Sequence, residues 1–147
     1  MPVRNAGEGN MPEGVAVARR RLLADEPSPP SVYLKVGEMP WEETKFPGIR
    51  MKVLYAEPDS GMSTILFKLE PGAEIPLHEH RAVEQTYVLE GRFVDDEGEA
   101  LPGEFVWRPA GNTHVARAPE GALLLGIFLK PNHFAGGERF FTEDERA

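Results

Sequence analysis

Short segments of this chain alternate apolar with polar residues and end at glycine or proline. Segment 49–56 places Met51, Val53 and Tyr55 on one side of an extended chain and two basic residues on the other. A period of two predicts strands with one buried face, whereas a helical stripe repeats every three or four residues. Gly (15) and Pro (14) make up nearly a fifth of the 147 residues. The pattern predicts an all-β domain of short strands joined by tight turns.

The predicted strands recur at intervals of about 8–12 residues, as is typical of an antiparallel sandwich or barrel. They are segments 49–56, 62–70, 75–80, 84–90, 92–95, 105–108, 113–117 and 122–129. Gly91, between two of them, predicts a bend or bulge. A chain of this length forms one domain with one core.

The first thirty residues differ in composition from the rest. Residues 15–23 form a short candidate helix without a clean apolar stripe, and the proline-rich stretch 27–30 is typical of a stiff, extended linker. We expect residues 1–30 to form an N-terminal arm and linker that packs on the barrel or on a neighbouring subunit. Residues 31–147 are then a single barrel domain.

Composition excludes several classes of function. A net charge of -8 argues against nucleic acid as a partner, and the isolated basic run 19–21 is interpreted as a solvated charged face. The absence of cysteine excludes disulfides and thiolate metal sites. Segment 121–129 is the longest apolar stretch and falls far short of the ~20 residues that span a bilayer. Since no secretory signal follows the N-terminus, we expect a cytoplasmic protein that binds a small molecule, with no membrane or nucleic-acid partner.

Three of the four histidines lie between positions 78 and 114. On a strand, His78 and His80 share a face, and Glu84 has the same parity beyond a predicted turn at 81–83, which could bring its carboxylate back toward the two rings. Each buried ring nitrogen left without a partner costs roughly 1–3 kcal/mol, and a shared metal ion would satisfy several at once. Spacing alone does not establish that His114 joins them.

Two spaced patterns in the sequence resemble the characteristic motifs of the cupin superfamily. The first is glycine, five residues, His-x-His, three residues, Glu, six residues and glycine, and the second is glycine, five residues, Pro-x-Gly, two residues and His. The positions that match are Gly72, His78, His80, Glu84 and Gly91 in the first motif, and Gly103, Pro109, Gly111 and His114 in the second. One departure is Ala118, where the family often has Asn; that Asn is not a metal ligand.

The resemblance implies a cupin double-stranded β-helix, or jelly-roll, barrel whose inward-facing His78, His80, Glu84 and His114 hold one divalent metal ion. Fe(II) is the expected ion, with Mn, Ni, Co, Cu and Zn as alternatives, because protein ligands alone rarely discriminate among these metals. Four protein ligands on a six-coordinate metal leave two positions open for substrate or dioxygen. A family tendency implies a homodimer.

Fold does not determine activity, because cupins include oxygenases, isomerases, lyases and sensors. The span from Met62 to Phe134 resembles small single-domain cupins related to acetylacetone and dihydroxyacetophenone dioxygenases, and the cupin domain of anti-sigma factors. The leading hypothesis is a non-haem dioxygenase that acts on a small carbonyl or phenolic compound, with Glu84 as a fourth ligand that detaches and acts as the general base. The alternatives are a redox-neutral metal-dependent isomerase or lyase, and a metal-binding sensor or regulatory domain.

Several other residues carry weaker expectations. The acidic tip 95–98 is interpreted as a solvent-facing turn, and His133 as a surface residue. Tyr87 and Trp107 are expected to pack between the sheets. Arg117 has outward parity relative to His114, so either it pairs with an anionic substrate or it lies on the outer surface.

Overall fold

The computed structural model describes residues 28–135. The chain divides into one unit over Met1–Tyr33 and a second over Leu34–Ala147, and the fold below is that of the second unit. The candidate helix at 15–23 lies outside the described residues, so the N-terminal arm stays a prediction. Within residues 28–135, no helix has the length and apolar character needed to cross a membrane.

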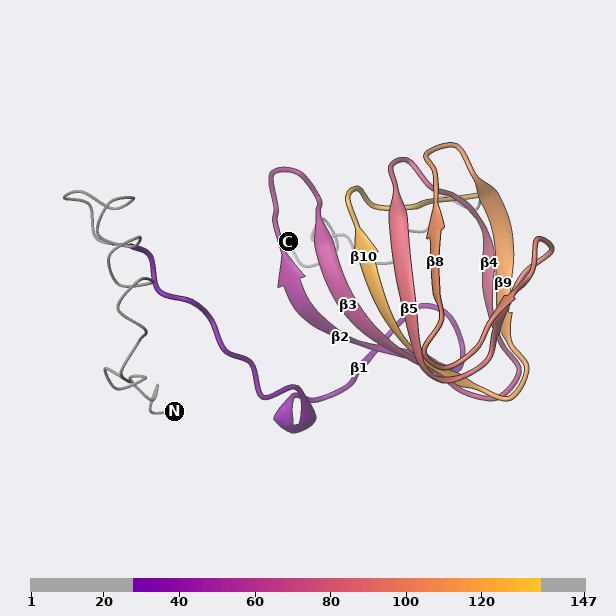
Figure 1. Cartoon of the computed structure of the whole chain (residues 1–147), viewed down its shortest axis with the longest axis horizontal. Coiled ribbons are helices and arrows are strands. Elements are labelled where there is room, and N and C mark those ends of the chain that lie inside the picture. Colours follow the sequence, from indigo (N-terminus) through magenta and orange to yellow (C-terminus); the bar gives the residue numbers. More distant parts are fainter. Residues whose placement is uncertain (1–27, 136–147) are drawn as a thin grey trace, which may run out of the picture. The chain divides into compact units, whose positions relative to one another are not determined.

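The all-β prediction is confirmed: the described residues form two antiparallel sheets and one short 3-10 turn (Figure 1). The six-stranded sheet has the order β1-β2-β3-β10-β5-β8, and the five-stranded sheet has the order β11-β4-β9-β6-β7. The elements are η1 (Val36–Glu38), β1 (Glu42–Glu43), β2 (Ile49–Ala56), β3 (Ser63–Leu69), β4 (Ala73–Glu79), β5 (Glu84–Gly91), β6 (Phe93–Val94), β7 (Glu99–Ala100), β8 (Phe105–Arg108), β9 (Thr113–Ala118), β10 (Ala122–Phe128) and β11 (His133–Phe134). The crossovers between non-consecutive strands are those of a jelly roll.

Alternation along the strands directs one set of side chains into the space between the sheets. Met51 of β2 is paired with Phe67 of β3, which is paired with Leu124 of β10, and Leu124 faces Val88 of β5. All four side chains are buried. Burying each such side chain stabilises the fold by about 1.5–3 kcal/mol, so this row is a main part of the core. Segment 49–56 is a strand as predicted, but the predicted alternation holds only in part: Met51 is buried, whereas Tyr55 is 51% exposed and Lys52 only 5%.

The bend or bulge predicted at Gly91 is present. Gly91 has a φ of 77°, and the pairing of β10 with β5 shifts register between Leu123 and Leu124. A Cβ atom at Gly91 would lie 2.0 Å from the carbonyl oxygen of Gly121. Only glycine therefore fits this position, for reasons of both backbone conformation and space.

Candidate metal centre

Two strands of the five-stranded sheet bring the histidines together. His78 near the end of β4 is paired directly with His114 of β9 across the antiparallel ladder, after a register shift between Ile75 and His78. His80 lies one residue beyond β4, but its backbone continues the pairing: its N–H donates to the carbonyl of Asn112, and its carbonyl accepts from the N–H of Gly111. The convergence of His114, which spacing could not establish, follows from this pairing.

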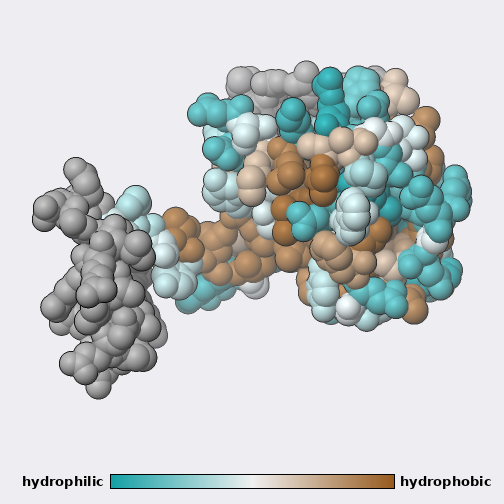
Figure 2. Space-filling view, turned by 45° about the horizontal axis from the view of Figure 1, so that its top comes forward, coloured by the Kyte–Doolittle hydropathy of each residue, from teal (hydrophilic) through white to brown (hydrophobic). Residues whose placement is uncertain are grey.

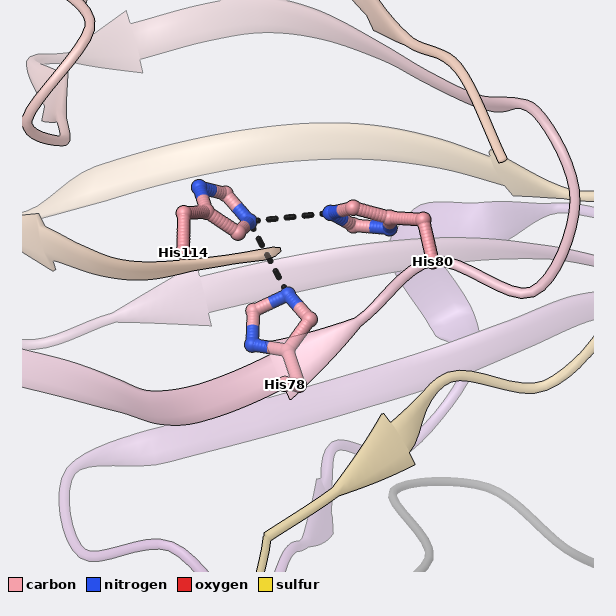
Figure 3. A group of neighbouring side chains, drawn as sticks. All are labelled: His78, His80 and His114. Atoms are coloured by element: carbon pink, nitrogen blue, oxygen red, sulfur yellow. Dashed lines mark hydrogen bonds between the residues drawn. The ribbon is translucent and has the colours of Figure 1, made fainter. Parts of the chain in front are cut away.

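The three rings point their Nε2 atoms at one another (Figure 3). Nε2 of His114 lies 2.9 Å from Nε2 of His78 and 3.0 Å from Nε2 of His80. Three ring nitrogens, one from each histidine, lie within 4.8 Å of one another. All three side chains are buried, with exposed fractions of 3%, 0% and 5% for His78, His80 and His114.

The opposite nitrogen of each ring, Nδ1, faces an acceptor. Nδ1 of His78 lies 2.7 Å from the carbonyl of Pro76, and Nδ1 of His114 lies 2.8 Å from Oδ2 of Asp95. Nδ1 of His80 lies 2.6 Å from Oε2 of Glu84. These acceptors favour the tautomer with the proton on Nδ1, which leaves a lone pair on each Nε2.

Electrostatics favour the neutral form of two of the three rings, those of His78 and His114. Burial lowers the pKa of His78 from 6.5 to about 4. Burial, followed by the nearby Arg108 guanidinium, also lowers the pKa of His114. Lone pairs that converge in a buried space repel one another unless a cation lies among them, and imidazole Nε2 is a common ligand of Fe, Mn, Co, Ni, Cu and Zn. The residues present therefore fit a divalent metal ion, although they do not select one metal.

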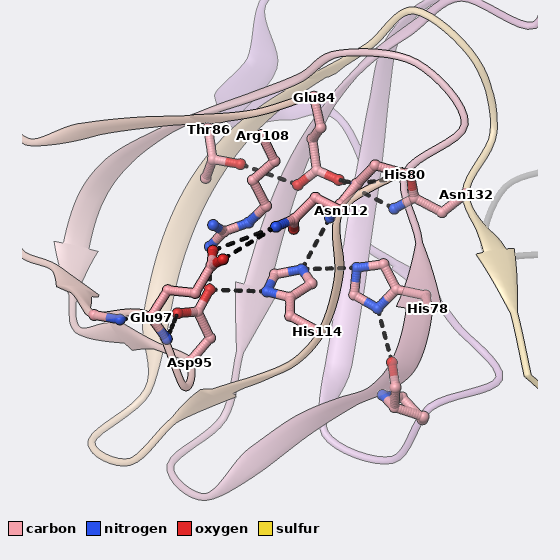
Figure 4. Close-up of polar contacts among 12 residues, drawn as sticks. His78, His80, Glu84, Thr86, Asp95, Glu97, Arg108, Asn112, His114 and Asn132 are labelled. Carbon is pink, nitrogen blue, oxygen red and sulfur yellow. Dashed lines mark hydrogen bonds and ion pairs between the residues drawn. The ribbon is translucent and has the colours of Figure 1, made fainter. Parts of the chain in front are cut away.

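Glu84 lies beside this cluster without joining it. Its carboxylate contacts the outward nitrogen of His80, and it also accepts a bond of 3.2 Å from the hydroxyl of Thr86 and one of 3.1 Å from the amide of Asn132 (Figure 4). Burial alone would raise the pKa of Glu84, but the contacts with His80 and Asn132 hold it below its ordinary value. The structure thus places an ionised carboxylate at the site. Its role as a fourth ligand stays a prediction.

Asp95 corrects the interpretation of the acidic tip as a wholly solvent-facing turn. Its side chain is only 3% exposed, and Oδ2 accepts from Nδ1 of His114 and from Nη2 of Arg108 at 2.7 Å. Oδ1 accepts from the backbone N–H groups of Glu97 and Gly98, so the turn itself aims the carboxylate inward. The next residues of the tip, including Asp96, are exposed as expected. No sequence motif distinguishes Asp95 from Asp96.

Asn132 is a second site residue that the sequence did not reveal. Its amide nitrogen donates to Glu84, which is 48 residues away in the sequence. Its Oδ1 lies 3.1 Å from Nδ1 of His80, which is 52 residues away. It precedes β11, which is paired with β4 and so brings it to the site. His133, the next residue, is exposed as predicted.

A mainly apolar pocket opens beside the cluster. It is lined by Phe67, Ile75, His78, Glu84, Thr86, Phe93, His114, Leu124, Gly126, Phe128, Asn132 and Phe134. Such a pocket, with a few convergent polar groups at one place, is typical of a small-molecule site.

Tyr87 and Trp107 do not line this pocket. Both side chains point outward and are exposed, which contradicts the expectation that they pack between the sheets. Arg117 is also exposed and paired with Glu74, on the outer surface.

Comparison with solved structures shows the same fold in several proteins. A protein of Methylibium petroleiphilum PM1, proposed to be an acetylacetone dioxygenase, matches with a TM-score of 0.70 and 20% identity over 82% of this chain and 95% of that one. An acetylacetone dioxygenase from Acinetobacter johnsonii matches with a TM-score of 0.65 and 18% identity, over 80% and 87% of the two chains. The Rhodobacter sphaeroides complex of SigE with the anti-sigma ChrR matches with a TM-score of 0.55 and 18% identity, over 78% and 77%.

At these identities the likeness shows the fold alone. No curated protein matches the sequence. The model of the ChrR cupin-like domain family matches residues 30–135, which is most of the chain and includes both histidine motifs. With the jelly-roll topology and the three-histidine cluster, this match establishes that the chain belongs to the ChrR cupin-like domain family.

Proposed function

We propose that this protein is a metal-dependent dioxygenase that acts on a small carbonyl or phenolic compound. The observation that carries the proposal is the group of three buried imidazole Nε2 atoms, together with the mainly apolar pocket that two of the rings, those of His78 and His114, line. Fold similarity to an acetylacetone dioxygenase adds support from outside the chain.

His78, His80 and His114 would hold the metal through Nε2, with Fe(II) the expected ion. When bound, such an ion would supply Lewis acidity and one-electron chemistry toward dioxygen. The chain's own contribution begins with the pocket, where Phe67, Phe128 and their neighbours exclude water and accept a small apolar molecule.

Glu84 is the group proposed to take the substrate's proton. It is ionised, lines the same pocket as two of the histidines, and is held in place by Thr86 and Asn132. A substrate with an acidic C–H or O–H group, as in an enolisable ketone or a phenol, would transfer that proton to a carboxylate oxygen of Glu84. His80, whose Nδ1 faces Oε2, keeps the carboxylate close to the cluster.

The proposal is tested by oxygen uptake with the Fe(II)-loaded protein across β-diketones, hydroxyaryl ketones and flavonols. We expect at least one class to be consumed together with dioxygen, and expect His80→Ala to abolish the uptake. His133→Ala is the matched control, because His133 is exposed and contributes no atom to the cluster. Consumption of a substrate without oxygen uptake would instead favour a redox-neutral isomerase or lyase.

A second candidate is a regulatory metal-binding domain. It is favoured by membership of the ChrR cupin-like domain family and by the fold similarity to ChrR in its complex with SigE. This reading predicts metal binding without turnover of any compound, and metal-dependent capture of a sigma factor. Turnover with loss of dioxygen would contradict it.

A further inference from the structure

Arg108 carries a positive charge inside the barrel. The barrel surface is a mixture of hydrophilic and apolar areas (Figure 2). Arg50, Arg92 and Arg117 are basic residues of that surface, and each is paired with a carboxylate. The side chain of Arg108, by contrast, is only 8% exposed. A guanidinium does not lose its proton in a protein, so Arg108 is a fixed charge at a place where water and salt screen it least.

The strand that carries Arg108 directs its side chain inward. Alternation along β8 places Phe105 and Trp107 outward, and the last residue of the strand, Arg108, is buried on the other face. It is paired with Glu84 of β5. Its guanidinium extends toward the other sheet, where Nη2 lies 2.7 Å from Oδ2 of Asp95, the residue after β6 (Figure 4). The ion pair therefore joins the two sheets beside the histidine cluster.

Asp95 connects the guanidinium to the histidine cluster. The same oxygen of Asp95, Oδ2, also lies 2.8 Å from Nδ1 of His114, so Arg108 and His114 share one acceptor. On the opposite side of the ring, Nε2 of His114 faces the Nε2 atoms of His78 and His80. The contacts thus run without a break from a fixed positive charge to a nitrogen that would hold the metal.

The turn holds Asp95 in place independently of Arg108. Oδ1 of Asp95 accepts from the backbone N–H groups of Glu97 and Gly98, and Oδ2 accepts from His114. These three donors remain when Arg108 is replaced. Replacing Arg108 is therefore expected to remove a positive charge while the carboxylate stays behind His114.

We propose that Arg108 sets the reduction potential of the metal ion that the three histidines would hold, and that it acts through Asp95 and His114. An anionic acceptor at Nδ1 makes Nε2 a stronger electron donor, which favours the more highly charged state of a metal. A guanidinium on the same acceptor oxygen offsets that charge and favours the divalent state. Arg108 is thus a positioning residue. The inference rests on the proposed function, for which it keeps the expected iron as Fe(II).

The test is the one-electron reduction potential of the iron-loaded protein, titrated without oxygen with dithionite, which supplies the electron to Fe(III). Arg108→Gln removes the positive charge, and we expect it to favour Fe(III) over Fe(II) at least about tenfold, which lowers the potential by ~59 mV. Asp95→Asn removes the negative charge and should raise the potential. The double variant removes both charges and should return close to the wild-type value. A merely structural role would not produce opposite shifts that cancel.

Arg117→Gln is the matched control, because Arg117 lies on β9 with His114 but its side chain is 58% exposed. Its potential should equal that of the wild type. Arg108→Lys keeps a positive charge and should lie closer to the wild type than Arg108→Gln does. Arg108→Met takes the place of Arg108→Gln if the latter does not fold by circular dichroism.

Two results would overturn this proposal alone. One is a folded, iron-loaded Arg108→Gln protein whose potential is unchanged or raised, and the other is a folded Arg108→Gln protein that no longer binds iron. A wild-type protein that takes up no iron would overturn it together with the proposed dioxygenase.

Discussion

At the scale of single residues, the site depends on the Nδ1 partners of its histidines. A backbone carbonyl, the carboxylate of Asp95 and the carboxylate of Glu84 each face one Nδ1. Partners of this kind fix the ring orientation and make the ligand nitrogen more basic. The neutral state that burial imposes on His78 also leaves its Nε2 free for a metal without loss of a proton near neutral pH.

Removing the charge of Asp95 should weaken metal binding. Asp95→Asn keeps the shape of the side chain but loses the charged acceptor for His114 and the ion pair with Arg108. We expect metal affinity to fall about 10–100-fold, as is usual for such outer partners. Competition against a metal chelator measures the change. Asp96→Asn, in the same turn but exposed, is the control, and equal affinity of the two variants would show that Asp95 does not act through His114.

His78 should make the stability of the metal-free protein depend on pH. Its pKa in the fold is about 4, below the unfolded value of 6.5, so the unfolded chain binds the extra proton first as pH falls. The contribution of neutral His78 to the free energy of unfolding is complete above pH 6.5 and is lost as pH falls toward 4. This loss lowers the free energy of unfolding by on the order of 3 kcal/mol. Urea unfolding with a chelator present measures it. His78→Gln should show a smaller loss between these pH values, and an identical loss would contradict the assignment.

At the scale of elements, periodicity was sufficient to predict the main strands, because burial of one sheet face imposes a period of two. It could not predict short strands such as β11, whose two residues show no period. His114 reaches His78 and His80 because of the register of β4 with β9. The second motif implied that His114 belongs to the site, but the spacing of the histidines along the chain did not. Asp95 and Asn132 reach the site through a turn and a loop, and no local pattern indicates such contacts.

Gly91 provides a test of the bulge between β5 and β10. We expect Gly91→Ala to lower the free energy of unfolding by about 1–3 kcal/mol or more, because alanine disfavours the positive φ and its Cβ would overlap the backbone of Gly121. Urea denaturation measures the change. Gly98→Ala, where φ is not positive and an added Cβ meets nothing within 4 Å, should change stability little. Equal effects of the two substitutions would mean that the bulge is not constrained as described.

At the scale of the whole molecule, two sheets place a small apolar pocket and a three-histidine cluster between them, while the outer side of β5 and β8 remains apolar. The sequence predicted the barrel from the periodicity of its strands, and the histidine cluster from the resemblance of residues 72–114 to the two motifs. It did not predict that Trp107 points outward. An aromatic residue inside a sheet usually indicates a buried face, and here the face it belongs to is exposed in the single chain.

Elemental analysis of the purified protein tests whether His78, His80 and His114 hold one divalent metal ion. We predict one equivalent of metal per chain in the wild-type protein and in His133→Ala, and none in His80→Ala. A wild-type protein that takes up no Fe, Mn, Co, Ni, Cu or Zn would contradict metal binding by these three histidines, as would a His80→Ala variant that retains a full equivalent.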